Sequence, residues 1–186
     1  MILLKHRANT IEEFDKRYGM EIDLRDFGDK LVISHDLPNQ NSLKLEEFLS
    51  KIPNETFLAI NVKSSEIEIE LKKILDKYNF KNYFTFDHSI PSLIKSIKCS
   101  LSCAFRLSEY EKEIIPNCSW VWVDCFEKIW YDVEYLKSLK NLTLKIALVS
   151  PELHGRKSEI HKFEEIVNSI SVDVICTDIP EYWYND

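Results

Sequence analysis

The sequence predicts an α/β protein built as a compact (β/α)₈ TIM barrel, and three observations support this fold class. Short runs of apolar, β-branched and aromatic residues alternate with charged segments of helical periodicity, as expected of βαβ units around a parallel sheet. No Ser-, Gly- or Pro-rich linker interrupts the 186 residues, so a single domain spanning 1–186 is expected. An open, doubly wound sheet is the alternative. The GxGxxG and GxxxxGK[ST] motifs that often accompany that fold are absent from the sequence.

The predicted strands are short and rich in residues that favour extended structure. The first is the apolar run at the start of the chain, and the second alternates apolar with charged residues, which indicates one polar face. In chain order, the eight predicted barrel strands cover residues 2–6, 20–25, 57–63, 83–87, 101–107, 120–124, 142–150 and 172–178. A further strand at 30–35 follows the turn at 27–29 and predicts a β-hairpin excursion after the second barrel strand.

The segments between these strands have the charged, amphipathic character of helices that cover a sheet. The predicted helices cover residues 10–18, 42–52, 66–78, 90–98, 109–115, 133–139 and 158–170. Thr10 and Glu13 have the spacing of a capping box, which predicts a helix start at this point. TIM barrels rarely have fewer than about 200 residues, so the loops of this chain must be short.

Composition argues against several partners. The net charge is −7 and the Lys and Arg residues form no long run, so we expect no nucleic-acid partner. The five cysteines include no CxxC pair and are expected to be free thiols. No apolar stretch approaches the ~20 residues of a membrane span, and the apolar start is too short for a signal peptide. A cytoplasmic protein with no membrane partner is therefore expected. The sequence does not predict the oligomeric state.

Polar residues follow almost every predicted strand, at the end where TIM barrels carry their reacting groups. They are His6, Arg7, Glu21, Asp23, His35, Asp36, Asn61, Lys63, Asp87, Arg106, Asp124 and Asp178. Because the strands are parallel, these side chains should meet at one mouth of the barrel. The sequence therefore predicts a single active-site face.

Glu21 and Asp23 are the strongest signal within this set. They lie two residues apart on one strand and so point to the same face, while Met20, Ile22 and Leu24 fill the other face. Two carboxylates inside a barrel mouth repel each other unless one is protonated or a cation bridges them. A divalent metal site is the preferred interpretation, and a solvent-exposed polar face is the alternative.

Two histidines after different strands suggest proton transfer. A single histidine is more often structural, but acid–base catalysis needs one group that takes a proton and another that gives one, and histidine titrates in the required range. His6 and His35 fit these two roles. His88, His154 and His161 are expected to be surface or secondary residues.

The order of these motifs resembles that of the glycerophosphodiester phosphodiesterases. HR at 6–7, GMEIDLR at 19–25 and LVISHD at 31–36 resemble the HRG, E.D and HD elements of that family, and they are the specific part of the match. LAINVKS at 58–64 and VDVICTDIPE at 172–181 are similar to its third-strand and closing-strand elements.

The resemblance implies a metal-dependent phosphodiesterase that acts on a small soluble diester, such as a glycerophosphodiester or a sugar or polyol phosphate diester. In it, His6 and His35 would be the general acid and base, and Glu21 and Asp23 would hold Ca²⁺ or Mg²⁺. Arg7 and Lys63 would bind phosphate. Arg106 is a further candidate for phosphate binding.

The chain also departs from the family pattern. The third metal-binding Glu of the family is Asn61 here, whose amide oxygen can still coordinate a hard cation. Asp124 could supply the missing charge from across the barrel. HRANT at 6–10 replaces a longer loop of the family.

Two other functions remain open. The first is a metal-independent phospholipase-C-like lyase in which Arg7 or Arg106 replaces the cation. The second is a binding or regulatory barrel that has lost catalytic activity. Asn61 and the shortened first loop would then mark the loss of active-site features. Convergence of His6, His35, Glu21 and Asp23 in one pocket would favour an enzyme.

Overall fold

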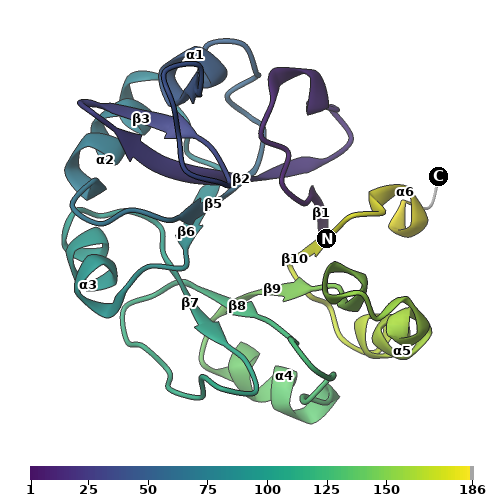
Figure 1. Ribbon diagram of the computed structural model, residues 1–186. Coiled ribbons are helices and arrows are strands. Elements are labelled where there is room, and N and C mark those ends of the chain that lie inside the picture. Colours follow the sequence, from purple (N-terminus) through teal and green to yellow (C-terminus); the bar gives the residue numbers. More distant parts are fainter. Residues whose placement is uncertain (185–186) are drawn as a thin grey trace.

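The computed structural model describes residues 1–184, so residues 185 and 186 of the predicted domain lie outside it. Eight parallel strands form the barrel. They are β1 (Ile2–Lys5), β2 (Gly19–Phe27), β5 (Leu58–Val62), β6 (Tyr83–Phe86), β7 (Ala104–Leu107), β8 (Trp120–Val123), β9 (Lys145–Val149) and β10 (Val174–Thr177). Neighbouring strands pair in parallel from β7 through β10 to β1, β2, β5 and β6. A single parallel bridge between Thr85 and Cys103 links β6 to β7 and completes the ring. The predicted TIM-barrel fold is confirmed, and Figure 1 looks along its axis.

The predicted β-hairpin after the second barrel strand is also confirmed. β3 (Lys30–Ile33) pairs antiparallel with the second half of β2, and the short strand β4 (Leu43–Lys44), which the sequence did not predict, extends the hairpin. Gly28 adopts a φ of 63° in the turn, a conformation that glycine reaches without steric cost. The hairpin therefore carries β3, and His35 after it, beyond the barrel wall.

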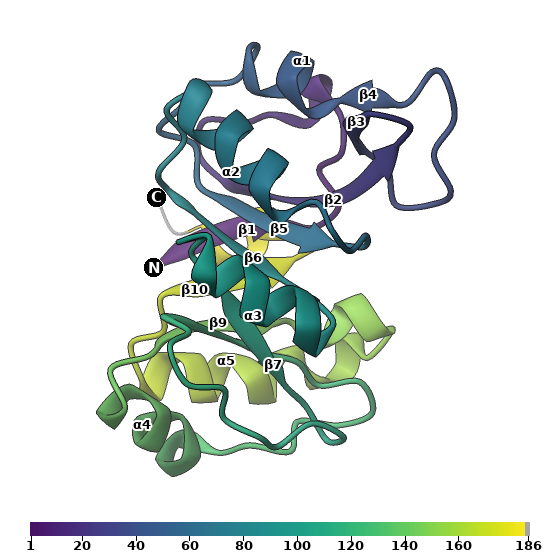
Figure 2. The same cartoon turned by 90° about the vertical axis from the view of Figure 1, so that its left-hand side faces the viewer.

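Helices cover the outside of the ring, as Figures 1 and 2 show. The α-helices are α1 (Leu45–Leu49), α2 (Glu68–Lys77), α3 (Ile90–Lys98), α4 (Val133–Asn141), α5 (Ile160–Ser169) and α6 (Pro180–Trp183). Short 3₁₀ turns are η1 (Ile11–Glu13), η2 (Pro151–His154) and η3 (Lys157–Glu159). In the described part of the chain, no helix has both the length and the apolar character needed to span a membrane.

Two of the predicted helices are wrong. Of residues 10–18, only the three residues of η1 are helical: Glu13 does accept a hydrogen bond from the backbone N–H of Thr10, but the chain is extended again at Phe14. Residues 109–115 form an irregular loop. There the carboxylate of Glu109 accepts hydrogen bonds from three backbone N–H groups of residues 126–128, so it is engaged in holding another loop. Tertiary contacts outweigh the local helical preference at both places.

Two layers of apolar side chains hold the barrel together. The larger layer lies between strands and helices, and the smaller one fills the interior with aromatic residues such as Phe84 and Trp120. Phe86 stacks on Trp122 with ring centroids 4.0 Å apart. The interior is therefore a packed core, as is usual for this fold, and polar chemistry is confined to the mouth at the C-terminal ends of the strands. These ends face the viewer in Figure 1 and point to the right in Figure 2.

Candidate active site

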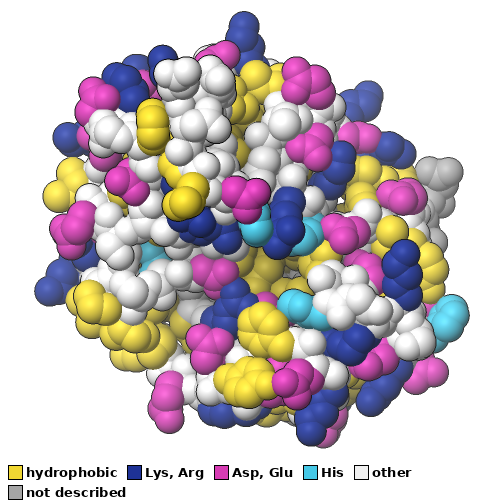
Figure 3. All heavy atoms as spheres, in the orientation of Figure 1, with side chains coloured by type: hydrophobic (Ala, Val, Ile, Leu, Met, Phe, Trp, Pro, Cys, Tyr) yellow, Lys and Arg dark blue, Asp and Glu magenta, His cyan; other side chains and the backbone are white. Residues whose placement is uncertain are grey.

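The mouth of the barrel carries a mixture of acidic, basic and histidine side chains. Figure 3 shows this face, with such side chains around a hollow near its centre. The first half of the mouth is formed by β10, β1, β2 and β5 with the hairpin. The second half is formed by β6 to β9. The residues predicted from the sequence divide between these halves.

Glu21 and Asp23 are buried in the first half, on the face of β2 that points into the barrel. Their exposed fractions are 2% and 1%, which excludes the alternative of a solvent-exposed polar face. One oxygen of Glu21, Oε2, accepts a hydrogen bond of 2.7 Å from the backbone N–H of Arg7. Burial raises the pKa of Glu21 to about 8, and the neighbouring charge of Asp23 acts in the same direction.

Asp23 is held on both oxygens. Its Oδ2 accepts a hydrogen bond of 2.8 Å from Nδ2 of Asn9, and its Oδ1 lies 3.1 Å from Nζ of Lys63. Asn9 in turn accepts a hydrogen bond from the backbone N–H of Asp23. The sequence analysis did not assign a role to Asn9. Its position in the short loop after the first strand was the only feature that pointed to the site. This loop is therefore fastened directly to the acid pair.

Asn61 completes the first half. It lies opposite Asp23 in the register of β2 and β5, and its Oδ1 is buried without a hydrogen-bond partner among the described residues. An orphaned amide oxygen beside two buried carboxylates is a set of donors that suits a hard divalent cation. Glu21, Asp23 and Asn61 therefore fit the metal that the sequence predicted. Within residues 1–184, no three Asp, Glu, His or Cys side chains form a metal-binding group. Asp124, predicted as a further ligand, is paired with Arg106 and His154, and its contribution to the metal site stays a prediction.

His6 and His35 are both paired with an acid. Nδ1 of His6 lies 2.8 Å from Oδ1 of Asp178, which leaves Nε2 for other contacts. Burial lowers the pKa of His6 below its ordinary value, although the hydrogen bond to Asp178 acts in the opposite direction. Nδ1 of His35 lies 3.0 Å from Oδ1 of Asp36, on the rim of the hairpin. The neutral form of His6 is therefore favoured at neutral pH.

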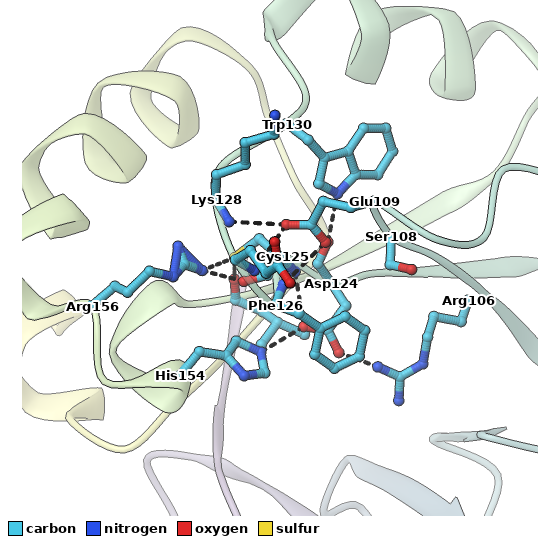
Figure 4. Close-up of polar contacts among 12 residues, drawn as sticks. Arg106, Ser108, Glu109, Asp124, Cys125, Phe126, Lys128, Trp130, His154 and Arg156 are labelled. Atoms are coloured by element: carbon cyan, nitrogen blue, oxygen red, sulfur yellow. Dashed lines mark hydrogen bonds and ion pairs between the residues drawn. The ribbon is translucent and has the colours of Figure 1, made fainter.

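The second half of the mouth contains a chain of paired charges. Arg106 on β7 forms ion pairs with Asp87 after β6 and with Asp124 after β8. Oδ1 of Asp124 lies 2.7 Å from Nε2 of His154 and also accepts a hydrogen bond of 2.8 Å from the backbone N–H of Cys125. Burial alone would raise the pKa of Asp124, but His154 and Arg106 outweigh it and keep that pKa below its ordinary value. Figure 4 shows the contacts of Asp124 with Arg106 and His154.

The three predicted phosphate-binding residues have different surroundings. Arg106 lies between two carboxylates, and Lys63 lies against Asp23, so most of their charge is already compensated. The Arg7 side chain is exposed and makes no ion pair with the described residues. Arg7 itself adopts a φ of 48°, a conformation that few non-glycine residues adopt. Arg7 is therefore the cation most available to an anionic ligand.

A cleft of about 950 Å³ opens beside the acid pair. Its walls come from the loops after β5, β6 and β7 and include Asn61, Lys63, Asp87 and Arg106. His6, His35, Glu21 and Asp23 do not line it. We take the buried acid pair and His6 as the chemical centre, because their burial and pairing need an explanation, and the cleft as space next to that centre.

Solved structures with the same fold cover nearly the whole chain. The glycerophosphodiester phosphodiesterase of Thermotoga maritima matches with a TM-score of 0.74 at 20% sequence identity, over 98% of this chain and 96% of that one. The enzyme from Agrobacterium tumefaciens matches with a TM-score of 0.75 at 13% identity, over 97% of both chains. This is the fold of the glycerophosphodiester phosphodiesterases. A glycerophosphoryl diester phosphodiesterase domain of a Mycobacterium tuberculosis protein also shares it, with a TM-score of 0.71 at 9% identity over 98% of this chain and 99% of that domain.

The glycerophosphodiester phosphodiesterase fold confirms what the motifs implied about architecture. No model of a known protein family matches the sequence, and no curated protein sequence matches it significantly. At identities of 20% and below, structural likeness establishes the fold, and function has to be argued from the residues of the site. The roles of His6, His35, Glu21 and Asp23 therefore remain predictions.

Proposed function

We propose that the protein is a phosphodiesterase that cleaves a small soluble phosphodiester, such as a glycerophosphodiester or a sugar or polyol phosphate diester. One observation carries this proposal: His6, oriented by Asp178, lies at the same wall of the mouth as the buried pair Glu21 and Asp23. Arg7 directly follows His6 in the chain. Its backbone N–H donates a hydrogen bond to Glu21, and its side chain is exposed. The site thus combines a proton-transfer group, an anion-binding group and a buried pair of acids of which, within residues 1–184, only Asp23 has a cationic partner, Lys63.

The residues of the chain can perform the proton transfers of the reaction. His6 is favoured in its neutral form, so its Nε2 can take a proton from the attacking hydroxyl group or water. A second histidine returns a proton to the leaving oxygen, and the motif resemblance assigns this role to His35. The exposed guanidinium of Arg7 binds the phosphate and stabilises negative charge on its oxygens.

Glu21, Asp23 and Asn61 would hold a divalent cation, with Ca²⁺ or Mg²⁺ as the expected ions. When bound, such a cation supplies positive charge to the phosphoryl oxygens. Lys63, which lies against Asp23, orients that carboxylate and offsets part of its charge. Glu21 needs the cation most, because its burial beside Asp23 disfavours its ionised form.

The first test is hydrolysis of bis-p-nitrophenyl phosphate and of a panel of glycerophosphodiesters, with and without Ca²⁺, Mg²⁺ and Mn²⁺. We expect metal-dependent turnover by the wild type and a decrease of about 10²- to 10⁴-fold in His6→Ala, the range typical for loss of a general base. Glu21→Ala should lose the metal dependence together with the activity. His161→Ala is the matched control, because the His161 side chain is 87% exposed on α5.

The outcomes also separate the two alternative functions. Turnover that resists EDTA would favour the metal-independent lyase, in which Arg7 supplies the positive charge, since Arg106 is already paired with two acids. No turnover together with metal binding in calorimetry would favour a binding barrel. The aromatic core does not plug the adjacent cleft of about 950 Å³, so ligand access is available in either case.

A further inference from the structure

A second histidine of the mouth, assigned no role in the proposed function, is better fixed than His35. His154 is the last residue of η2, which follows β9. Its Nε2 lies 2.7 Å from Oδ1 of Asp124, and Asp124 is 4% exposed. Asp124 is in turn held by the ion pair with Arg106 and by the N–H of Cys125. A buried carboxylate that is itself fixed on both oxygens sets the orientation and the tautomer of the imidazole.

The His35 pair is looser by comparison. The His35 side chain is 38% exposed, and its partner Asp36 is 94% exposed. An ion pair between exposed groups is weak and pays the entropy of holding both side chains in one geometry. The His154 side chain is 23% exposed, close to the 21% of His6. By the burial of its own ring, His154 resembles His6, and its partner Asp124 is more deeply buried than Asp178, the partner of His6, which is 54% exposed. His35 and Asp36 are the most exposed of the three pairs.

The segment that carries His154 is also fastened to the partner of His6. Glu152 precedes His154 by two residues in η2 and is buried. Its carboxylate accepts hydrogen bonds from the hydroxyl group of Thr177 and, at 3.3 Å, from the backbone N–H of Asp178. Asp178 then binds Nδ1 of His6. A continuous path of polar contacts thus fixes the two histidines relative to each other through the ends of β9 and β10.

The ring of His154 leaves one nitrogen available. In Figure 4 the dashed line from His154 runs to Asp124 only, and Nδ1 has no hydrogen-bond partner among the described residues. The edge-to-face contact with Phe126, at a centroid distance of 5.1 Å, holds the ring in place. The guanidinium of Arg106 lies 5.2 Å from the centroid of the Phe126 ring. His154 is therefore oriented from two sides and free on a third.

We propose that His154 is the general acid that protonates the leaving alcohol, as the counterpart of His6, and that His35 contributes less to this step. The proposal rests on the proposed phosphodiesterase function. As the attacking oxygen bonds to phosphorus, its proton passes to Nε2 of His6. The bond between phosphorus and the leaving oxygen breaks, its electron pair stays on that oxygen, and the oxygen takes the proton from Nδ1 of His154. Asp124, which stays ionised, stabilises the doubly protonated ring before the transfer.

Leaving groups of different basicity test this role. An alkyl alcohol leaves poorly without protonation, whereas p-nitrophenolate needs little help from an acid. We expect His154→Ala to lower kcat/KM for a glycerophosphodiester with an alkyl leaving group by about 10²- to 10³-fold. For bis-p-nitrophenyl phosphate the same variant should lose less than about tenfold. His35→Ala should show a smaller difference between the two substrates.

Added imidazole separates catalysis from structure. It should restore part of the activity of His154→Ala toward the alkyl diester and leave His161→Ala, the exposed control on α5, unchanged. Asp124→Asn should show the same dependence on the leaving group, because it removes the group that orients His154. Thermal unfolding monitored by circular dichroism verifies that each variant is folded.

Three results would overturn the inference. The first is equal loss on both substrates in folded His154→Ala, and the second is no loss on either. The third is a leaving-group effect in His35→Ala larger than that in His154→Ala. Failure of the proposed function is distinguishable from all three, because the wild type would then turn over neither diester, and the role of His154 would fall with it.

Discussion

The two halves of the barrel mouth solve the problem of buried charge in opposite ways. In the first half, the carboxyl groups of Glu21 and Asp23 are buried together, and within residues 1–184 Lys63 forms an ion pair with Asp23 only. The amide oxygen of Asn61 beside them lacks a partner in the described chain. In the second half, each charge from Asp87 through Arg106 to Asp124 meets an opposite one. The first half thus contains buried polar groups without a partner among the described residues and is called the incomplete half below. In the second half every one of these charges is paired, and it is called the complete half.

This difference indicates which half receives a ligand and which half provides a fixed frame. A buried carboxylate next to another is costly, and its charge can be retained only if a cation arrives. A buried ion pair with satisfied hydrogen bonds resists change, because removal of one partner leaves the other uncompensated. The frame of the second half also orients His154, so both halves contribute to the proposed reaction.

The largest expected effect is a loss of folding stability when the charge pairing of the complete half is broken. Arg106→Ala leaves Asp87 and Asp124 without their shared partner, and the loss of one member of a buried pair typically costs about 3–5 kcal/mol. We discount this to about 2–4 kcal/mol, because the Arg106 and Asp87 side chains are 17% and 21% exposed. Chemical denaturation at pH 7 measures the loss. Arg17→Ala, which removes an exposed ion pair with Asp15, is the control and should change stability little. Equal stability of both variants would show that the charge chain is not a frame.

The next effect concerns the pH dependence of the incomplete half. The pKa of Glu21 is about 8 in the folded chain and near 4.5 in the unfolded one, so its protonated form is favoured by folding. The resulting stability is fully present below pH 4.5 and is lost as the pH rises toward 8. The loss amounts to a few kcal/mol, since one pKa unit corresponds to about 1.4 kcal/mol.

Glu21→Gln should abolish most of this dependence. The free energy of unfolding of wild type and variant, measured in EDTA between pH 5 and pH 8.5, checks it. The two curves should differ least at pH 5 and separate steadily from there to about pH 8, with the variant more stable at high pH. Parallel curves would mean that Glu21 ionises normally, and the contrast between the halves would then disappear.

The smallest expected effect is a gain of metal affinity. Asn61→Glu adds a third carboxylate to Glu21 and Asp23, and ligand charge is one determinant of Ca²⁺ affinity. We expect calorimetry to show at least about tenfold tighter binding of Ca²⁺ or Mg²⁺ than in the wild type. Without metal, the same variant should be less stable, since a further like charge is buried. Asn61→Ala is the matched control and should bind more weakly than the wild type. Unchanged affinity in both variants would place the cation elsewhere.

Much of the fold could be predicted because it depends on local periodicity. The eight barrel strands and the hairpin are apolar runs whose spacing already requires extended structure, and the pairing of Glu21 with Asp23 on one face follows from the two-residue period of a strand. The errors lie where contacts distant in sequence decide. Residues 109–115 have helical periodicity, but Glu109 is engaged by backbone N–H groups of residues 126–128, and no local pattern shows that.

The candidate site could likewise be predicted only in part from the sequence. By itself the sequence determined which residues stand at the strand ends, because strand periodicity and parallel order are local properties. Only the tertiary structure decided their partners: Asp178 lies 172 positions from His6, and His154 lies 30 positions from Asp124. It also showed that Asp124 is paired with Arg106 and His154. The physical reason is that charge pairing and burial depend on distances across the closed barrel, and these exist only once all eight strands have come together.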